Sequence, residues 1–417
     1  MQYKITAPQS FSADVNLPAS KSISNRALII HALSGGTAMP RNLSDCDDTE
    51  VIIRALRDMP DTIDIKAAGT AMRFMTAMLA ATPSGCHTIT GTERMRHRPI
   101  GILVDALRYL GADITYVGEE GFPPLCINGR TLEGGHLEIP ANVSSQYISA
   151  LLMIGPVLKR GLELHMTGEI ASRPYIDLTL CMMREFGAEA DWSDIDTVTV
   201  APKPYVQRDY FIESDWSSSS YWYEMLALVA DRESTFSLDG LMDGSKQGDS
   251  VVRYIFSLLG VKSAFVAKDS SVPTTVHLKK TSMGKLPRFD YDFASSPDLA
   301  QTVVVTCAVS DIPFRFTGLA SLKIKETDRI EALKAELRKL GYVLRDEHDD
   351  TLIWDGERCT PTFEPIDTYE DHRMALAFAP AAIKFPGLVI REPGVVSKSY
   401  PHFWDDLRRA GFTIEEV

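Results

Sequence analysis

The 417-residue sequence lacks the patterns of a membrane protein, a secreted disulfide-rich protein or a metalloprotein. Its apolar runs all fall short of the roughly 20 residues of a membrane-spanning helix, and its first residues carry no signal-peptide core. The six cysteines form no C-x-x-C pair and the nine histidines form no H-x-x-x-H pattern, so neither a disulfide framework nor a metal site is predicted. We therefore expect a cytoplasmic protein with reduced thiols, no bound metal and no membrane contact.

Positive charge is also scarce. The chain has 43 lysines and arginines against 56 acidic residues, a formal net charge of −13. This balance disfavours nucleic acid and anionic membranes as partners. The phosphate-binding loop pattern Gly-x-x-x-x-Gly-Lys is absent as well. Any site for an anionic ligand must therefore be built locally, against the overall field of the protein.

Such a site is predicted near the N-terminus. The apolar run Ala27–Leu33 indicates a buried helix, and Ser20, Lys21, Ser22 and Arg26 lie at or before its start. A helix start offers free N–H groups and a positive dipole end, which attract anions. Hydroxyls and two cations at this point favour a phosphate or carboxylate site. An ordinary capped helix with two solvated cations is the alternative.

The coarse pattern of the chain repeats six times, with a period of about 75 residues. Each unit has a helix of small apolar residues, a strand, a loop and a second, amphipathic helix. The first-type helices are expected at 27–34, 71–81, 147–158, 221–230, 300–309 and 374–383, and the second-type helices at 49–57, 99–110, 175–186, 251–259, 329–340 and 403–409. Most second helices end in Gly, a favoured residue after a helix. The first unit is short and lacks a strand pair after its second helix, and a boundary between three-unit domains is expected near residues 210–215.

Other polar clusters precede predicted helices. Gly69 would let a ligand approach the backbone, Thr70 could cap the next helix, and the three arginines of 94–98 precede a helix expected to open at Pro99. The four serines of 217–220 are interpreted as capping. Hydroxyl or amide groups also precede helices at Ser144, Ser145, Gln146 and Ser172.

Charged groups gather in the second half of the chain. If residues 323–329 are helical, Lys325 and Arg329 share a face, with Glu326 close to Arg329. A carboxylate held among cations can serve as a general acid or base, although a salt-bridged surface turn has the same composition. Asp298 could be a helix cap or an acid–base group. Arg373 could hold a carboxylate through two hydrogen bonds, and Lys398 adds one more cation.

Together these stretches resemble the enolpyruvyltransferases, and specifically the EPSP synthase family (3-phosphoshikimate 1-carboxyvinyltransferases). The matching stretches are Ser20–Arg26, Ala68–Thr70, Arg98–Gly101, Ser144–Gln146, Ser172–Tyr175, Pro297–Asp298, Lys325–Arg329, Asp371–Met374 and Lys398. The resemblance implies an α/β (α+β) fold, a two-domain inside-out α/β barrel with three repeated β/α units in each domain. The implied domains are residues 1–19 with 214–417, which include the N-terminal strand, and residues 20–213.

The resemblance also implies a reaction. The enolpyruvyl group of phosphoenolpyruvate would move to the 5-hydroxyl of shikimate 3-phosphate, with release of phosphate and no cofactor, in a protein expected to be a monomer. Asp298 would take the hydroxyl proton, Glu326 would protonate the methylene carbon, and Lys21 would assist. Shikimate 3-phosphate would contact Lys21, Ser22, Arg26, Ser144, Ser145, Gln146, Ser172, Tyr175, Asp298, Ser321 and Lys325. Phosphoenolpyruvate would contact Lys21, Gly69, Arg98, Gln146, Arg329, Arg373 and Lys398. Both halves of the chain would be needed.

The sequence departs from the family pattern at three points: Ala67 and Ser321 replace asparagines, and the first repeat is short. Three other functions stay open at this point. A UDP-N-acetylglucosamine enolpyruvyltransferase would have Asn after Lys21, where Ser22 stands, and a loop cysteine as its acid. An RNA 3′-phosphate cyclase would want a basic surface. A phosphometabolite-binding protein without catalysis would not need Asp298 and Glu326.

Overall fold

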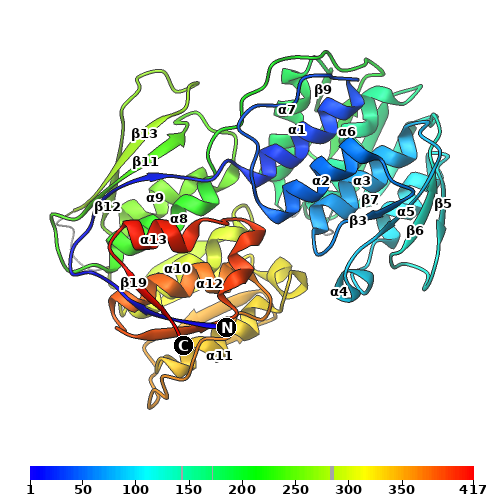
Figure 1. Ribbon diagram of the computed structural model, residues 1–417. Helices are drawn as coiled ribbons and strands as arrows, with labels where there is room; N and C mark the ends of the chain where they lie inside the picture. The colour runs from blue at the N-terminus through cyan, green and yellow to red at the C-terminus, as the bar shows by residue number, and fades with distance from the viewer. Residues whose placement is uncertain (142–143, 171, 282–285) are drawn as a thin grey trace. The chain divides into compact units, whose positions relative to one another are not determined.

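The computed structural model describes the chain except residues 142–143, 171 and 282–285 (Figure 1). It divides into two compact units. The C-terminal unit comprises Met1–Pro18 and Glu213–Val417, and the N-terminal unit comprises Ala19–Ile212. Each unit has its own hydrophobic core.

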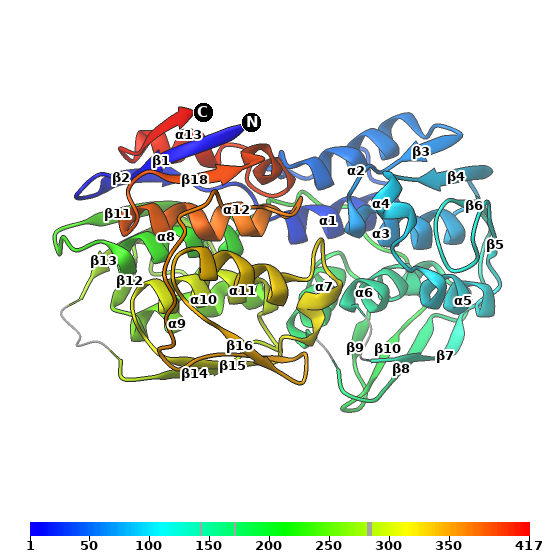
Figure 2. The same ribbon diagram turned by 90° about the horizontal axis from the view of Figure 1, so that it is seen from below.

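The N-terminal unit places its most apolar helices inside and its sheets outside. Its helices are α1 (Lys21–Leu33), α2 (Asp47–Asp58), α3 (Gly69–Ala81), α4 (Glu93–Arg96), α5 (Gly101–Tyr109), α6 (Ser145–Ile154) and α7 (Arg173–Glu185). In α3 every residue except Thr70 is buried, including Arg73, and most of the helix consists of small and apolar residues. Helices α1 and α6 pack against α3, and the two sheets lie on the outside of this unit (Figures 1 and 2).

The C-terminal unit has the same arrangement. Its helices are α8 (Trp216–Leu228), α9 (Val252–Leu258), α10 (Ala300–Val309), α11 (Arg329–Lys339), α12 (His372–Phe378) and α13 (Phe403–Arg409), with the short 3-10 turns η2 (Gly248–Val251), η3 (Pro297–Leu299) and η4 (Ala320–Ile324). All ten residues of α10 are buried, and α10 packs against both α8 and α12. The inside-out α/β architecture and the expected helices are therefore confirmed.

Four sheets share one strand order and one pattern of directions: a parallel pair followed by two antiparallel pairs. They are β3-β4-β6-β5 (Thr62–Asp64, Cys86–Thr90, Leu125–Asn128, Asp113–Tyr116), β7-β8-β10-β9 (Gly135–Pro140, Leu162–Thr167, Thr197–Val200, Ala190–Trp192), β2-β11-β13-β12 (Ser12–Asn16, Thr235–Leu241, Thr274–Lys280, Val261–Phe265) and β14-β15-β17-β16 (Phe289–Asp292, Phe314–Thr317, Thr351–Trp354, Arg345–Glu347). This identity of topology is direct evidence for an internal repeat.

The fifth sheet and the first repeat depart from that pattern. In the fifth sheet, β1 (Gln2–Thr6) lies between β18 (Leu388–Arg391) and β19 (Thr413–Glu416) and is antiparallel to both. In the first repeat, α2 leads within a few residues to β3, which already belongs to the next sheet. The sheet of this repeat is reduced, among the described residues, to the parallel bridge between Arg41 and Phe211. The predicted shortening of the first unit is therefore confirmed.

Several predicted helix ends need correction. Asp215 caps α8 by accepting from Ser218 N, so the four serines lie inside the helix instead of capping it. Thr70 is also inside its helix, because α3 begins at Gly69. Helix α5 begins at Gly101, two residues after Pro99. The glycines that follow the second helices do behave as predicted: Gly111 and Gly187, for example, have φ of 102° and 85°. Among the described residues no helix has the length and apolar character needed to cross a membrane.

Candidate active site

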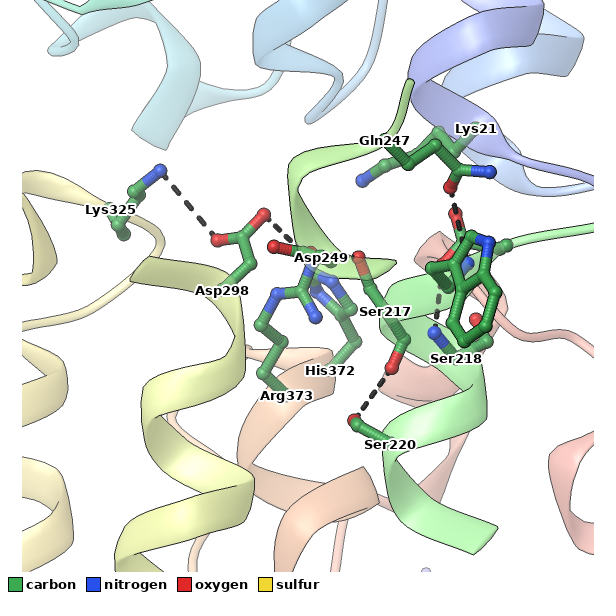
Figure 3. Close-up of polar contacts among 12 residues, drawn as sticks. Lys21, Ser217, Ser218, Ser220, Gln247, Asp249, Asp298, Lys325, His372 and Arg373 are labelled. Carbon is green, nitrogen blue, oxygen red and sulfur yellow. Dashed lines mark hydrogen bonds and ion pairs between the residues drawn. The ribbon is translucent and has the colours of Figure 1, made fainter. Parts of the chain in front are cut away.

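In the C-terminal unit, Asp298 is the meeting point of three cations. It lies in η3, directly before α10. Its Oδ2 accepts from Arg373 Nη2 at 2.8 Å, and its Oδ1 lies 3.8 Å from Lys325 Nζ (Figure 3). The same Oδ1 lies 3.4 Å from Arg329 Nη1. A carboxylate positioned by three cations is suited to accept the proton of a bound hydroxyl.

Arg329 is the buried centre of the cluster. It is the first residue of α11, and its side chain is only 2% exposed. Its Nε donates to Asp371 Oδ2 at 2.7 Å and its Nη2 donates to Glu326 Oε2 at 3.0 Å. Burial alone would lower the pKa of Arg329, but the carboxylates, led by Asp371, outweigh burial and raise it. This cation is therefore permanently charged and held in one orientation.

Glu326 lies between two cations. Its Oε1 is 2.7 Å from Lys398 Nζ, and its Oε2 accepts from Arg329. The predicted helix from residue 329 is confirmed as α11, which Asp328 caps. The condition that residues 323–329 are helical is not met, because η4 ends at Ile324. The chain is thus non-helical between η4 and α11, and Lys325 and Glu326 lie in that stretch.

Lys325 has a different electrostatic setting from that of Arg329. Its side chain is 31% exposed and approaches Asp298. Desolvation lowers its pKa, and the opposing attraction of Asp298 is not enough to restore it. A lysine of lowered pKa can hold an anion and can also exchange a proton more readily than a surface lysine.

Sequence reasoning missed two residues that complete this cluster. Burial, followed by the charge of Asp298, raises the pKa of Asp249 to about 7, and its Oδ2 accepts from Ser217 (Figure 3). Tyr221 on α8 accepts from Arg373 Nη1 at 3.3 Å. The sequence marks these residues only by their place at a helix start or on a buried helix. Their nearness to Asp298 comes from tertiary packing, in which α8 contacts both η2 and η3.

In the N-terminal unit, Arg26 is the buried cation. Its Nε donates to Thr179 Oγ1 at 2.7 Å, its Nη2 to Ser149 Oγ at 3.2 Å, and its Nη1 to Ser22 O at 3.0 Å. Burial lowers its pKa to about 10. Ser149 is on α6 and Thr179 on α7, so one guanidinium joins α1 to the two helices whose starts carry the other predicted hydroxyls.

The remaining predicted residues of this unit lie at helix starts. Ser144 caps α6 by accepting from Gln146 N, and Ser145 and Gln146 open that helix. Ser172 and Tyr175 stand at the start of α7, where Ser172 has a left-handed φ of 55°. The C-terminal unit contributes one further predicted hydroxyl, Ser321, which lies in η4.

A second anion-binding candidate surrounds the start of α3. Gln146 Nε2 donates to Thr70 Oγ1 at 3.0 Å, and Arg73 Nη1 donates to Gly69 O at 3.0 Å. A Cβ added to Gly69 would lie 2.8 Å from Arg73 Nη1 and 2.9 Å from Arg98 Nη1. The absence of a side chain at Gly69 therefore lets the Arg98 guanidinium lie against the backbone. Lys21, at the start of α1, pairs with Asp48 at 3.3 Å.

The charged groups described here suit anionic organic substrates and acid–base chemistry. Among the described residues, no group of three His, Cys, Asp or Glu side chains has an arrangement that could hold a metal ion. The six-repeat architecture, with apolar helices inside and sheets outside, is that of the two-domain inside-out α/β barrels.

Comparison with known proteins gives the family. The profile of EPSP synthase (3-phosphoshikimate 1-carboxyvinyltransferase) matches residues 5–64 and 58–407. A 3-phosphoshikimate 1-carboxyvinyltransferase of Bacteroides fragilis is 59% identical over 416 residues, covering 100% of this chain and 99% of its own. One from Shewanella halifaxensis is 34% identical, covering 97% and 98%. The solved EPSP synthase of Acinetobacter baumannii shares the fold, with a TM-score of 0.78, 21% identity and full coverage of both chains. The chain belongs to the EPSP synthase family.

Proposed function

We propose that this protein transfers the enolpyruvyl group of phosphoenolpyruvate to the 5-hydroxyl of shikimate 3-phosphate, which releases phosphate. The observation that carries the proposal beyond family membership is the pair of carboxylates in one cation cluster, Asp298 and Glu326. The reaction needs one proton removed from an alcohol and one added to a vinyl carbon. The two carboxylates share Arg329, but Arg373 and Lys325 contact Asp298 while Lys398 contacts Glu326, so their surroundings differ and they can divide these roles.

In the first step, Asp298 accepts the proton of the 5-hydroxyl as its oxygen attacks C2 of phosphoenolpyruvate. Arg373 and Lys325 contact Asp298 and would hold it toward the substrate. In the same step Glu326 donates a proton to the methylene carbon, which becomes a methyl group, and a tetrahedral adduct forms. In the second step phosphate leaves the adduct, and the Glu326 carboxylate takes a proton back from the methyl carbon, which restores the vinyl group. Asp298 gives its proton to the departing phosphate, so both carboxyl groups return to their starting states.

The partners of Glu326 explain how a carboxyl group among cations could act as an acid. Without substrate, Lys398 and Arg329 favour its ionised form. We propose that both cations bind phosphoenolpyruvate. Its negative charges would then neutralise the cations, so the cations would no longer stabilise the Glu326 carboxylate. Glu326 could then hold a proton for transfer.

The remaining roles are assigned by position. We propose that Ser22, Arg26, Ser144, Ser145, Ser172 and Tyr175 bind shikimate 3-phosphate together with Ser321 and Lys325. Gly69 and Arg98 would bind phosphoenolpyruvate with Arg329, Arg373 and Lys398, while Lys21 and Gln146 would contact both substrates. We also propose that the two compact units are the three-repeat domains, and that the enzyme is a cytoplasmic monomer.

Release of phosphate from phosphoenolpyruvate tests the reaction. Shikimate 3-phosphate, shikimate and UDP-N-acetylglucosamine are each supplied as the acceptor. We expect release with shikimate 3-phosphate, and rates at least 10²-fold lower with the other two, because they lack a 3-phosphate for Arg26 and its neighbouring hydroxyls. Equal rates with UDP-N-acetylglucosamine would refute the assigned acceptor, and no release with any acceptor would refute catalysis.

A further inference from the structure

Two cysteine thiols lie side by side on the outer sheet of the N-terminal unit. Cys86 begins β4, and Cys126 lies on the antiparallel neighbour β6. Their sulfur atoms are 3.0 Å apart, although the residues are 40 positions apart in sequence. A disulfide bond length is about 2.05 Å, so an approach of about 1 Å would bring the sulfurs to bonding distance.

The register of the strands explains the contact. Cys126 lies opposite Thr88, which places Cys86 two residues along the neighbouring strand. Side chains two positions apart on a strand point to the same face, so the two thiols lie diagonally on one face of the sheet. Cys86 is exposed and Cys126 is half-buried. A dissolved disulfide can therefore reach Cys86 first, while the neighbouring Cys126 thiol is close enough to attack the Cys86 sulfur afterwards.

We propose that Cys86 and Cys126 form a reversible intramolecular disulfide, a redox modification site, when the protein meets a low-molecular-mass disulfide. The Cys86 thiolate attacks one sulfur of that disulfide and releases one small thiolate, leaving a mixed disulfide on Cys86. The Cys126 thiolate then attacks the Cys86 sulfur, forms the cross-strand bond and releases the second small thiolate. The two cysteines lose two electrons and two protons, and the small disulfide is reduced to two thiols.

The surroundings of Cys86 set the conditions of the reaction. The Cys126 thiol, followed by weaker effects that include the Asp113 and Asp61 carboxylates, raises the pKa of Cys86. The thiolate is the attacking species, so exchange should be slow at neutral pH and faster at alkaline pH. The same carboxylates favour a cationic oxidant over an anionic one. Cystamine, a cationic disulfide, at about pH 8.5, the ordinary pKa of a cysteine thiol, is therefore the suitable probe.

The cross-link would close a covalent loop that runs from β4 through Arg98 and α5 to β6. Closing a loop lowers the entropy of the unfolded chain, so the oxidised protein should unfold at a higher temperature. The bond would lie outside the residues proposed to bind substrate. The inference therefore does not depend on the proposed reaction.

The test treats the full-length protein with cystamine and analyses its peptides by mass spectrometry. We expect a cross-linked peptide pair containing Cys86 and Cys126, a loss of two hydrogen masses per chain, and four of the six thiols still titratable after unfolding. Cys126→Ser should accumulate cysteamine on Cys86 and form no internal cross-link. Cys359→Ser, a change at another half-buried cysteine, should cross-link like the unchanged protein.

Different experimental results would support or overturn the proposed disulfide. Removal of the cross-link by dithiothreitol, with recovery of all six thiols, would support reversibility. Stable mixed disulfides on both Cys86 and Cys126, a cross-link that uses a different cysteine, or bonds only between separate chains would each overturn the proposal. Circular dichroism of each serine variant shows whether its fold is kept. If Cys126→Ser does not fold, the cross-linked peptide from the unchanged protein still decides.

Discussion

Asp371 holds Arg329 through both of its carboxylate oxygens, at 2.7 Å to Nε and 3.2 Å to Nη2. The same carboxylate caps α12 by accepting from Arg373 N at 2.9 Å. Both members of the pair are buried. One side chain thus fixes the direction of a buried cation and the start of the helix that carries another, Arg373.

Asp371→Asn separates these two roles, because Asn is also a good helix cap but carries no charge. Arg329 would keep Glu326 and Asp298 as counter-charges but lose its closest one. We expect the KM for phosphoenolpyruvate to rise about tenfold, equivalent to about 1.4 kcal/mol of binding free energy. Steady-state phosphate release measures this change.

The control is the KM for shikimate 3-phosphate in the same variant, which should change less than threefold. If both KM values rise equally, Asp371 supports the fold generally and does not orient Arg329. Thermal unfolding of the variant distinguishes that case, because the melting temperature would then fall sharply.

Glu326→Gln tests the proposed general acid. Gln keeps the size of the side chain and can still accept a hydrogen bond from Lys398 or Arg329, but it cannot supply the proton. We expect kcat to fall by about 10²-fold or more, the usual scale for such a group, with smaller changes in KM. Asp298→Asn should behave in the same way, as the proposed base. A variant of either residue with near-normal kcat would exclude that residue from proton transfer.

Gly69→Ala tests the close approach of Arg98 to the start of α3. The new Cβ would meet the guanidinium ends of Arg73 and Arg98 at under 3.0 Å, so at least one of them must move. We expect a higher KM for phosphoenolpyruvate and weaker inhibition by a phosphonate competitor such as glyphosate. The KM for shikimate 3-phosphate should stay nearly constant, and an equal loss for both substrates would indicate a role in folding instead.

Glu224 predicts a pH dependence of stability. This residue of α8 is fully buried, and neither carboxyl oxygen has a hydrogen-bond partner among the described residues, since the nearby Thr306 hydroxyl donates to Thr302 O. Burial raises its pKa well above the ordinary 4.5. The folded state therefore keeps a proton that the unfolded state releases, and stability falls as the pH rises from about 4.5 toward the raised pKa.

Glu224→Met removes the buried carboxyl group, and with it the cost of keeping that group protonated at high pH, while it preserves the length of the side chain. We expect the melting temperature to rise by at least about 2 °C at pH 8, which corresponds to about 1.8 kcal/mol if the whole chain unfolds together. At pH 4.5 the gain should shrink. A gain that is equal at both values, measured by calorimetry, would mean that packing and not ionisation determines the effect.

The periodic features of the chain could be predicted from the sequence, and its local irregularities could not. The buried helices α3 and α10 consist mostly of small and apolar residues, and a Gly follows most second helices, so both the helices and their repeat could be predicted. The start of α11 at Arg329 was predicted, but the non-helical conformation of Lys325 and Glu326 was not, because their charge spacing alone is also compatible with a helix. Asp249 and Asp371 owe their importance to partners far away in sequence, at Asp298 and Arg329. Such contacts follow from packing, which local patterns do not encode.

The position of β1 between β18 and β19 has a consequence for synthesis. The first strand of the chain cannot acquire its neighbours until Leu388–Glu416 has been made, so almost the whole polypeptide must leave the ribosome before this sheet closes. Until then, both edges of β1 stay open to pairing with other chains. Pairing between the two ends of a long chain is also slow to form. A nascent chain arrested before residue 388 should therefore be more prone to aggregation and more dependent on chaperones than the released protein.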